Sequence, residues 1–302
     1  MFVLAHLSDL HLGPLPAPSP RELASKRLFG FVNWLLRRHR CHRPEVAAAI
    51  VDDVKAAAPD HIALTGDVIN LALEREFAPA RAWLDRLGAP DRLTLVPGNH
   101  DVYVRATARH AERCWGEWMR GDDLAFGPAP GGPTPGAFPF VRRRGPIALV
   151  ALSTALPTGP LLASGKLGGG QTERLAHLLT QLTGTFRVVL MHHPPLGSRP
   201  HHKRLRDAQA FRRVLGEHGA ELVLHGHDHR QSLDWLDGPT GRIPVLGVPS
   251  LSAPGSFDDD PAAYNLYRIG GSPGSWRCEA ISRGLGAGAK SVVELRRETL
   301  IG

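Results

Sequence analysis

The chain opens with the stretch MFVLAHLSDLHLG (residues 1–13), and the interpretation of everything after it depends on these residues. The apolar run over residues 2–5 predicts a buried strand, with Asp9 and His11 at its C-terminal end. Side chains two residues apart in an extended segment point to the same face, so this carboxylate and this imidazole would project together. Such a pair suits a divalent transition metal. A turn residue beside a surface histidine would give the same pattern, so the pair alone does not decide between the two.

The same kinds of polar group follow four more apolar strands. The strands expected at 61–65, 92–96, 186–191 and 222–224 are followed by Gly66-Asp67, Gly98-Asn99-His100-Asp101, His192-His193 and His225-Gly226-His227-Asp228-His229. In open α/β sheets, ligands bind at the carboxyl ends of the strands. Each cluster alone could be a turn, a cap or a loop histidine. Five such clusters restricted to Asp, Asn and His together indicate one metal site.

The composition limits the classes of protein to which the chain can belong. The chain has 302 residues, 42% of them hydrophobic, which is enough to bury a full core. Lys and Arg number 36 against 29 Asp and Glu, and the net charge of +7 favours anionic partners without identifying them. Three widely separated cysteines fit neither a disulfide framework nor a cysteine zinc site. No run approaches the ~20 apolar residues of a membrane span, and no signal-peptide pattern opens the chain, so we expect a cytoplasmic protein.

Helical and strand patterns alternate as far as residue 225, after which short antiparallel strands are expected. Helices are expected at 44–58, 74–87, 107–119, 172–182 and 207–218, and later strands at 232–236, 242–248, 264–269 and 276–282. We therefore expect a single domain over residues 1–285, with residues 286–302 as a C-terminal strand or tail.

A basic amphipathic insertion, residues 21–43, follows the first metal motif. A helix is expected over residues 21–40, with one apolar face and one polar face. The apolar face carries Leu28, Phe31, Val32 and Leu35, and the polar face carries Lys26, Asn33, Arg37 and Arg40. Two interpretations stay open: the helix packs over the domain with its basic side in solvent, or it lies on an anionic membrane surface or shields a ligand.

At the metal motifs the chain resembles the calcineurin-like metallophosphoesterase superfamily. The superfamily's motifs D-x-H, G-D, G-N-H-D, H and G-H-x-H correspond here to Asp9-Leu10-His11, Gly66-Asp67, Gly98-Asn99-His100-Asp101, His192, and Gly226 between His225 and His227. All occur in order within residues 9–229. The resemblance implies an α/β fold, a four-layer α/β/β/α sandwich of two mixed sheets, with a dinuclear metal site at the C-terminal ends of the strands.

The resemblance also implies a role for each motif residue. One divalent ion would be held by Asp9, His11 and His227, the other by Asn99, His192 and His225, and Asp67 would bridge them. His100 would steady the transferring phosphoryl group or protonate the leaving oxygen, and Asp101 would orient its ring. His193 and His229 are candidate substrate contacts. The two ions could be Mn, Fe or Zn, since all three accept mixed nitrogen and oxygen ligands.

The charges of such a centre suit an anionic phosphodiester. Two divalent ions would contribute four positive charges. Asp9, Asp67 and a bridging hydroxide would contribute three negative charges, so the net charge of the centre would be roughly +1. The implied reaction is in-line attack of the metal-bridging hydroxide on the phosphodiester.

The segments HLSDLHL, PGNHD and HHPP resemble bacterial class III cyclic-nucleotide phosphodiesterases, so a small diester such as a 3',5'-cyclic nucleotide is the expected substrate. The alternative is a peripheral-membrane hydrolase of a lipid-linked phosphodiester or pyrophosphate, suggested by residues 21–43. The related UDP-diacylglucosamine hydrolases usually have Arg where this chain has His100, which counts against that particular activity. No DNA-binding arm follows residue 229, so a nuclease and a specific nucleic-acid partner are not expected. A non-catalytic scaffold would typically have lost metal ligands, and this chain has kept them.

Overall fold

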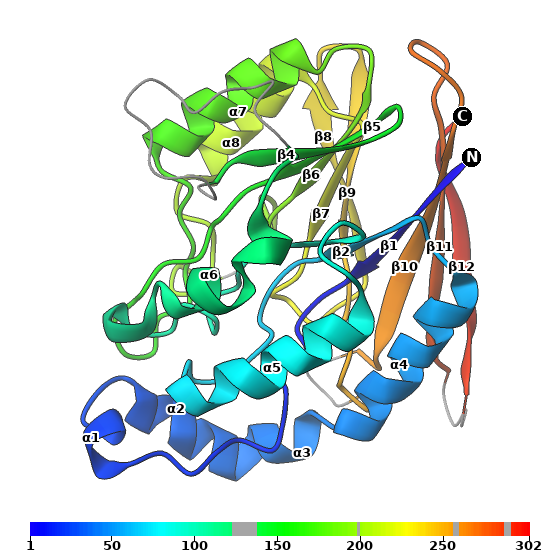
Figure 1. Cartoon of the computed structure of the whole chain (residues 1–302). Helices are drawn as coiled ribbons and strands as arrows, with labels where there is room; N and C mark the ends of the chain where they lie inside the picture. The colour runs from blue at the N-terminus through cyan, green and yellow to red at the C-terminus, as the bar shows by residue number, and fades with distance from the viewer. Residues whose placement is uncertain (123–137, 198–199, 256–259, 287–290) are drawn as a thin grey trace.

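The computed structural model describes residues 1–122, 138–197, 200–255, 260–286 and 291–302. Two six-stranded sheets, here called sheet A and sheet B, pack face to face and carry helices on their outer faces (Figure 1). Residues of both sheets, such as Leu64 of sheet A and Leu190 of sheet B, belong to one buried apolar cluster. The expected four-layer α/β/β/α arrangement of two mixed sheets is therefore confirmed.

Sheet A has the strand order β12-β11-β10-β1-β2-β3. Its central strand β1 (Phe2–Leu7) pairs antiparallel with β10 (Ala263–Gly270) and parallel with β2 (His61–Leu64). The outer strands are β3 (Leu93–Leu95), β11 (Arg277–Leu285) and β12 (Val292–Ile301). The C-terminal segment thus supplies an edge strand of sheet A, and its residues 287–290 lie outside the described residues.

Sheet B has the strand order β4-β5-β6-β7-β9-β8. Its four inner strands run parallel: β5 (Ile147–Ala151), β6 (Phe186–Leu190), β7 (Leu222–His225) and β9 (Gly241–Gly247). The antiparallel edges are β4 (Phe140–Arg144) and β8 (Ser232–Gly238). The carboxyl ends of β1, β2 and β3 in sheet A and of β6 and β7 in sheet B lead into the loops that carry the metal motifs.

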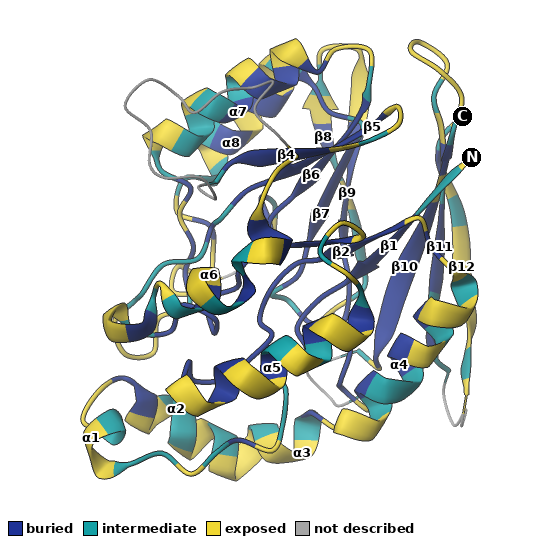
Figure 2. Cartoon of the chain, viewed as in Figure 1, coloured by how far each residue is buried: buried dark blue, intermediate teal, exposed yellow. Residues whose placement is uncertain are grey.

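Amphipathic helices cover the outer faces of both sheets (Figures 1 and 2). They are α4 (Pro44–Ala57) and α5 (Glu74–Leu87) on sheet A, and α7 (Gly169–Gln181) and α8 (Ala208–His218) on sheet B. In α4 the buried Ile50, Val51 and Val54 recur at helical spacing, whereas Asp52 and Lys55 on the opposite side are exposed. The helix expected over residues 107–119 is instead divided into η2 (Arg105–Thr107), α6 (His110–Trp115) and η3 (Gly116–Met119).

The helix expected over residues 21–40 is instead one separate turn followed by a continuous helical run with a π-helical middle, and these four elements are together called the cap (residues 20–41). They are α1 (Pro20–Leu23), α2 (Arg27–Asn33), the π-helical η1 (Trp34–Arg38) and α3 (His39–Cys41). Only part of the expected apolar face packs onto the domain: Phe31 contacts the core, whereas Leu28, Val32 and Leu35 are exposed. Across the described residues, we find no helix with the length and apolar character needed to cross a membrane.

Candidate metal centre

Five of the candidate site residues adopt a left-handed backbone conformation. They are Asp9 (φ 55°), His11 (φ 45°), Asp67 (φ 54°), His227 (φ 72°) and His229 (φ 53°). Positive φ is uncommon outside glycine and clusters at functional sites, where the surrounding structure holds it. Because β1 ends at Leu7, Asp9 and His11 do not converge through strand alternation as expected; the left-handed turns bring His11 Nε2 to 3.8 Å from Asp9 Oδ1.

A first group of converging ligand atoms comes from Asp9, His11 and His229. His229 Nε2 lies 3.3 Å from Asp9 Oδ1 and 3.2 Å from His11 Nε2. The other oxygen of Asp9, Oδ2, accepts the backbone N–H of His227 at 2.9 Å, and this bond fixes the orientation of the carboxylate. One carboxylate oxygen and two imidazole nitrogens therefore meet at one point.

A second group comes from Asn99, His192 and His227. His192 Nε2 lies 3.2 Å from Asn99 Oδ1 and 3.3 Å from His227 Nδ1. Asp67 stands between the two groups, since its Oδ2 is 3.4 Å from His192 Nε2 and 3.8 Å from His11 Nε2. A single carboxylate thus reaches both groups, which is what a ligand shared by two ions requires.

These distances correct the expected division of the histidines. His227 lies in the second group rather than with Asp9 and His11, and His229 takes its place in the first. Among the described residues, no set of three converging ligand atoms includes His225. The His225 Nδ1 atom lies 3.0 Å from the Gly226 carbonyl oxygen, and a Cβ placed on Gly247 would come within 2.6 Å of its ring. The motif G-H-x-H therefore corresponds to Gly226-His227-Asp228-His229, a register that the glycine in front of its first histidine already indicates.

The hydrogen bonds behind the site show which ring nitrogens face it. His11 Nδ1 lies 3.3 Å from the Ile69 carbonyl oxygen, and His192 Nδ1 lies 2.6 Å from that of Thr65. His227 Nε2 is likewise 2.8 Å from the Lys203 carbonyl oxygen. A carbonyl oxygen only accepts, so each of these nitrogens carries a proton and the second ring nitrogen is the one that faces the centre. Histidines that bind metals are held in this way.

The residues present fit a pair of divalent cations. Asp9 Oδ1 is buried and accepts no hydrogen bond from any described residue, while lone pairs of neighbouring imidazoles are directed at the same space. Burial holds the pKa of His11 and His227 well below the usual value, which keeps both rings neutral. Buried acceptors that face one another without a donor call for a cation. The mixture of nitrogen and oxygen ligands suits Mn, Fe and Zn alike.

Two glycines let the ligand loops approach one another. A Cβ on Gly98 would lie 2.1 Å from Asp67 Oδ1, and a Cβ on Gly226 would lie 2.5 Å from Asp9 Oδ2. Any larger residue at either position would displace a carboxylate of the site. The glycines of the G-N-H-D and G-H-x-H motifs are therefore needed for close backbone packing.

Asp101 does not orient the ring of His100, contrary to expectation. Its carboxylate accepts the backbone N–H groups of Gly98, Asp67, Val68 and Ile69 at 2.8, 2.9, 2.8 and 3.2 Å. Burial, followed by the charge of Asp67, raises the pKa of the Asp101 carboxyl to about 7, and the N–H groups oppose this rise. Asp101 instead joins the loop that carries Asp67 to the loop that carries Asn99.

His100 is placed beside Asp67 and is held by four neighbouring groups. Its backbone N–H donates to Asp67 Oδ1 at 2.7 Å, and its Nδ1 contacts the Asn70 carbonyl oxygen. Arg38 Nη1 lies 2.9 Å from Nε2, and the Tyr103 ring stacks on the imidazole at 5.3 Å. Burial and then Arg38 lower the pKa of His100 to about 3, so the ring is neutral and its Nε2 accepts from the guanidinium.

His193 is buried, and one of its ring nitrogens lies within 4.8 Å of ligand nitrogens of His192 and His227. Thr154 Oγ1 lies 2.8 Å from its Nδ1, and the Ala163 carbonyl oxygen lies 3.1 Å from its Nε2. Both ring nitrogens are therefore used within the protein. That His193 contacts substrate stays a prediction.

Two residues at the site, Arg38 and His42, were not expected there. The ring of His42 lies 4.5 Å from that of His11, and its Nδ1 is 2.9 Å from Ser252 Oγ. Its ligand nitrogen falls within 4.8 Å of those of His11 and His229. Both residues come from the insertion rather than from a strand end, so the strand pattern carried no signal for them. Their position directly after the first metal motif was the available hint.

Comparisons with known proteins agree with this geometry. The model of the calcineurin-like phosphoesterase family matches residues 2–231. A probable cyclic nucleotide phosphodiesterase of Synechococcus sp. is 25% identical over 237 residues, which cover 77% of this chain and 80% of that protein. A purple acid phosphatase from yellow lupin seeds has a TM-score of 0.58 at 10% identity, covering 94% of this chain and 51% of that one. GAP50, described as the anchor in the inner membrane complex of Plasmodium, has a TM-score of 0.51 at 10% identity, covering 99% and 88% of the two chains. The two structures share the fold.

Proposed function

The chain belongs to the calcineurin-like phosphoesterase family, and we propose that within it the protein is a two-metal phosphodiesterase for small anionic diesters. The observation that carries the proposal is the pair of ligand groups joined by Asp67, with His100 beside them. The similarity to a probable cyclic nucleotide phosphodiesterase supports a diester, and a 3',5'-cyclic nucleotide is the first substrate to test.

In this proposal Asp9, His11 and His229 hold one ion, Asn99, His192 and His227 hold the other, and Asp67 binds both. The two ions would supply Lewis acidity that activates water and stabilises charge on the phosphoryl group. Asn99 is a neutral ligand, so the carboxylates do not cancel the positive charge of the ions. A centre with excess positive charge attracts an anionic substrate and favours the more highly charged transition state.

His100 and Arg38 form the side of the site where a phosphoryl group would rest. Arg38 approaches the Nε2 edge of His100, and the backbone of His100 is bonded to the shared ligand Asp67. A guanidinium has several N–H groups in one plane and matches the oxygens of a phosphate better than a lysine does. We assign to Arg38 the binding of non-bridging phosphoryl oxygens, and to His100 the positioning of the same group.

A lipid-linked phosphodiester or pyrophosphate is the second candidate substrate class. It is favoured by the exposed apolar side chains of the cap, the element that also carries Arg38. Such a substrate would place its headgroup at the same ligand groups. The protein would then act at the membrane periphery, whereas a cyclic nucleotide would be met in the cytoplasm.

The proposal is tested by comparing hydrolysis of bis-p-nitrophenyl phosphate with that of p-nitrophenyl phosphate after loading with Mn. We expect faster cleavage of the diester, in keeping with the similarity to a probable cyclic nucleotide phosphodiesterase. The Asp67→Asn variant should lose both activities, which assigns them to this site. Faster cleavage of the monoester would make the protein a phosphomonoesterase and rule out the cyclic-nucleotide proposal.

A further inference from the structure

The inward side of the cap combines polar anchors with two aromatic rings, since Phe31 and Trp34 pack against the core. Arg27 lies buried and donates from Nε to the Leu71 carbonyl oxygen at 2.9 Å. A Cβ on Gly30 would come within 2.4 Å of Tyr103 Oη, so the helix backbone touches the domain here. Arg38 reaches His100 from the same side. The inward positions 27, 30 and 38 therefore anchor the cap through polar groups and a close backbone contact.

The opposite side of the cap is an exposed apolar stripe, here called the cap stripe. It consists of Leu28, Phe29, Val32, Leu35 and Leu36, which are between 44% and 71% exposed. The positions follow the spacing i, i+1, i+4, i+7 and i+8, which is one face of a helix. A helix on the surface of a globular protein normally buries such a face, whereas the cap stripe is exposed in addition to the inward Phe31 and Trp34.

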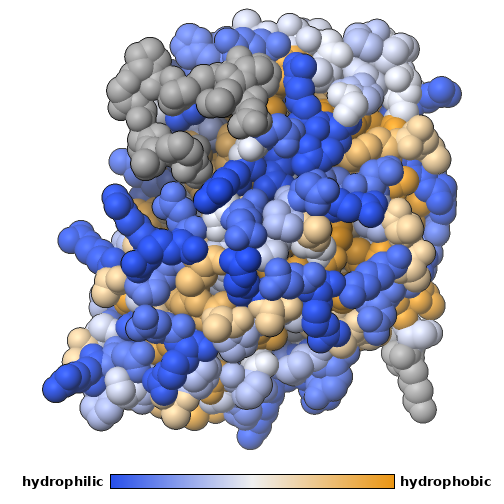
Figure 3. Space-filling view, viewed as in Figure 1, coloured by the Kyte–Doolittle hydropathy of each residue, from blue (hydrophilic) through white to orange (hydrophobic). Residues whose placement is uncertain are grey.

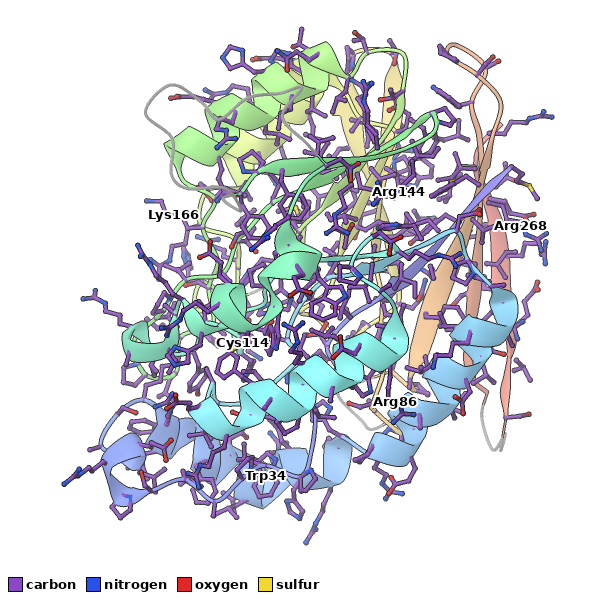
Figure 4. The ribbon with its side chains drawn as sticks, in the orientation of Figure 1. Trp34, Arg86, Cys114, Arg144, Lys166 and Arg268 are labelled. Atoms are coloured by element: carbon purple, nitrogen blue, oxygen red, sulfur yellow. The ribbon has the colours of Figure 1, made fainter. Side chains whose placement is uncertain are left out.

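The cap stripe contains half of the ten large apolar side chains that are exposed in the described ranges. Two more, Leu161 and Leu162, sit on a loop that Lys26 ties to the cap through Thr158 Oγ1 at 2.7 Å and the Leu162 carbonyl oxygen at 3.1 Å. Exposed apolar residues gathered in this way mark an interaction surface. The cap forms the lower edge of the molecule in Figure 1, and Figure 4 places Trp34 there.

The basic residues around the cap stripe indicate which kind of partner would cover it. Residues 20–43 contain seven Lys and Arg residues and a single acidic residue, Glu22. Glu22 is already paired with Arg75 at 3.0 Å, and Arg21, Arg40 and Arg43 are exposed. Figure 3 shows apolar and strongly hydrophilic side chains side by side along this lower edge. A second copy of the chain is a poor partner, because a symmetric contact would bring the basic residues of both caps together.

We propose that the cap stripe inserts into the interface of an anionic lipid bilayer, with the exposed arginines of the cap at the level of the lipid phosphates. Large apolar residues such as Leu and Phe on one side of a helix, with basic residues along its borders, are typical of helices that lie in the membrane plane. The basic residues near the surface add attraction to anionic lipids. Membrane docking does not depend on the proposed phosphodiesterase activity, since it rests on the outer face of the cap.

The test is co-sedimentation of the full chain with vesicles of phosphatidylcholine alone and with ~30% phosphatidylglycerol. We expect binding to the anionic vesicles, loss of that binding at high salt, and little binding to neutral ones. The double variant Leu35→Ser with Leu36→Ser should bind roughly tenfold more weakly or worse. The matched control is Val293→Ser with Leu295→Ser, which removes two exposed apolar side chains from β12 and should bind like the wild type.

Two charge-reversal variants separate the electrostatic contribution to membrane binding from the apolar contribution. Arg40→Glu in the cap should weaken binding to anionic vesicles, whereas Arg212→Glu on the exposed side of α8 should leave it unchanged. Equal unfolding midpoints for all variants show that the fold is retained. The proposal is overturned if the wild-type chain does not bind anionic vesicles at low salt, or if the β12 control loses as much binding as the cap variant. It is also overturned if the cap variant converts a dimer into a monomer in sedimentation velocity, since the stripe would then contact a second copy.

Discussion

Arg38 approaches the metal centre from the cap and not from a loop at the end of a strand. It comes from the π-helical turn η1 and lies 2.9 Å from His100 Nε2. π-helical turns are rare and occur frequently at functional sites. The wide turn ends at Arg38, so the irregularity of the helix and the approach of the guanidinium to the metal centre coincide at one residue.

Replacing Arg38 by Ala should lower kcat/KM for a diester by about ten- to a hundredfold, because a charged hydrogen bond to the phosphoryl group is lost. Weaker inhibition by inorganic phosphate should accompany this loss, since phosphate would use the same donors. Metal content should not change. The Arg38→Lys variant should recover part of the phosphate affinity, whereas Arg40→Ala, on the exposed side of the cap, serves as the control. Unchanged phosphate inhibition in Arg38→Ala would remove Arg38 from the substrate site.

Some residues of the site could be predicted from sequence and others could not. Asp9, His11, Asp67, Asn99 and His192 all follow apolar strands and carry the motif letters, so their convergence could be predicted. The choice among His225, His227 and His229 could not be made from strand ends, because all three lie within five residues; the position of Gly226 was the sequence signal that favours His227 and His229. Arg38 and His42 come to lie at the site only through the tertiary fold, and no local sequence pattern predicts such a contact.

At the scale of the elements, the strands and the long helices were predictable because their burial is regular. β5, β6 and β7 are buried along their whole length, and α4 buries residues at helical spacing. The cap breaks that rule, since five of its apolar side chains are exposed while Phe31 and Trp34 pack against the core beside buried polar anchors such as Arg27. Periodicity identifies a helical face but does not say which way that face points.

The pairing of β2 and β3 gives a pH dependence of stability. His61 is the first residue of β2, and its Nε2 lies 2.8 Å from Thr94 Oγ1 on β3. Burial, and then the nearby Arg144 and Arg142, lower the pKa of His61 to about 3. The folded state therefore cannot protonate this ring near pH 5, whereas the unfolded chain binds a proton below about pH 6.5. Its contribution to stability is present above the unfolded pKa and is lost progressively as the pH falls toward 3.

Urea unfolding of the wild type and of His61→Gln at pH 7.5 and pH 5.0 measures this effect. Between these two pH values the wild type should lose on the order of 2 kcal/mol more free energy of unfolding than the variant. Each protein is compared with itself at the two pH values, which cancels the packing change that the substitution causes. An equal loss of unfolding free energy in both proteins would show that protonation of His61 is not linked to unfolding.

At the scale of the whole molecule, the fold brings together loops that are far apart in the chain. The two sheets share one apolar core, and the loops after β1, β2, β3, β6 and β7 meet at one edge of the sandwich. The order of the five motifs along the sequence made this architecture predictable. The orientation of the cap is a property of the assembled molecule, because it depends on contacts with the loops around Leu71 and Tyr103.

The most direct test of the two-metal centre is the metal content of three proteins after loading with Mn and removal of free metal. Elemental analysis should give two ions per chain for the wild type and for His225→Ala, and about one for His229→Ala, because His229 belongs to the first ligand group and His225 to neither. Unfolding midpoints should confirm that both variants remain folded. Loss of an ion in His225→Ala with two retained in His229→Ala would contradict this assignment of the centre.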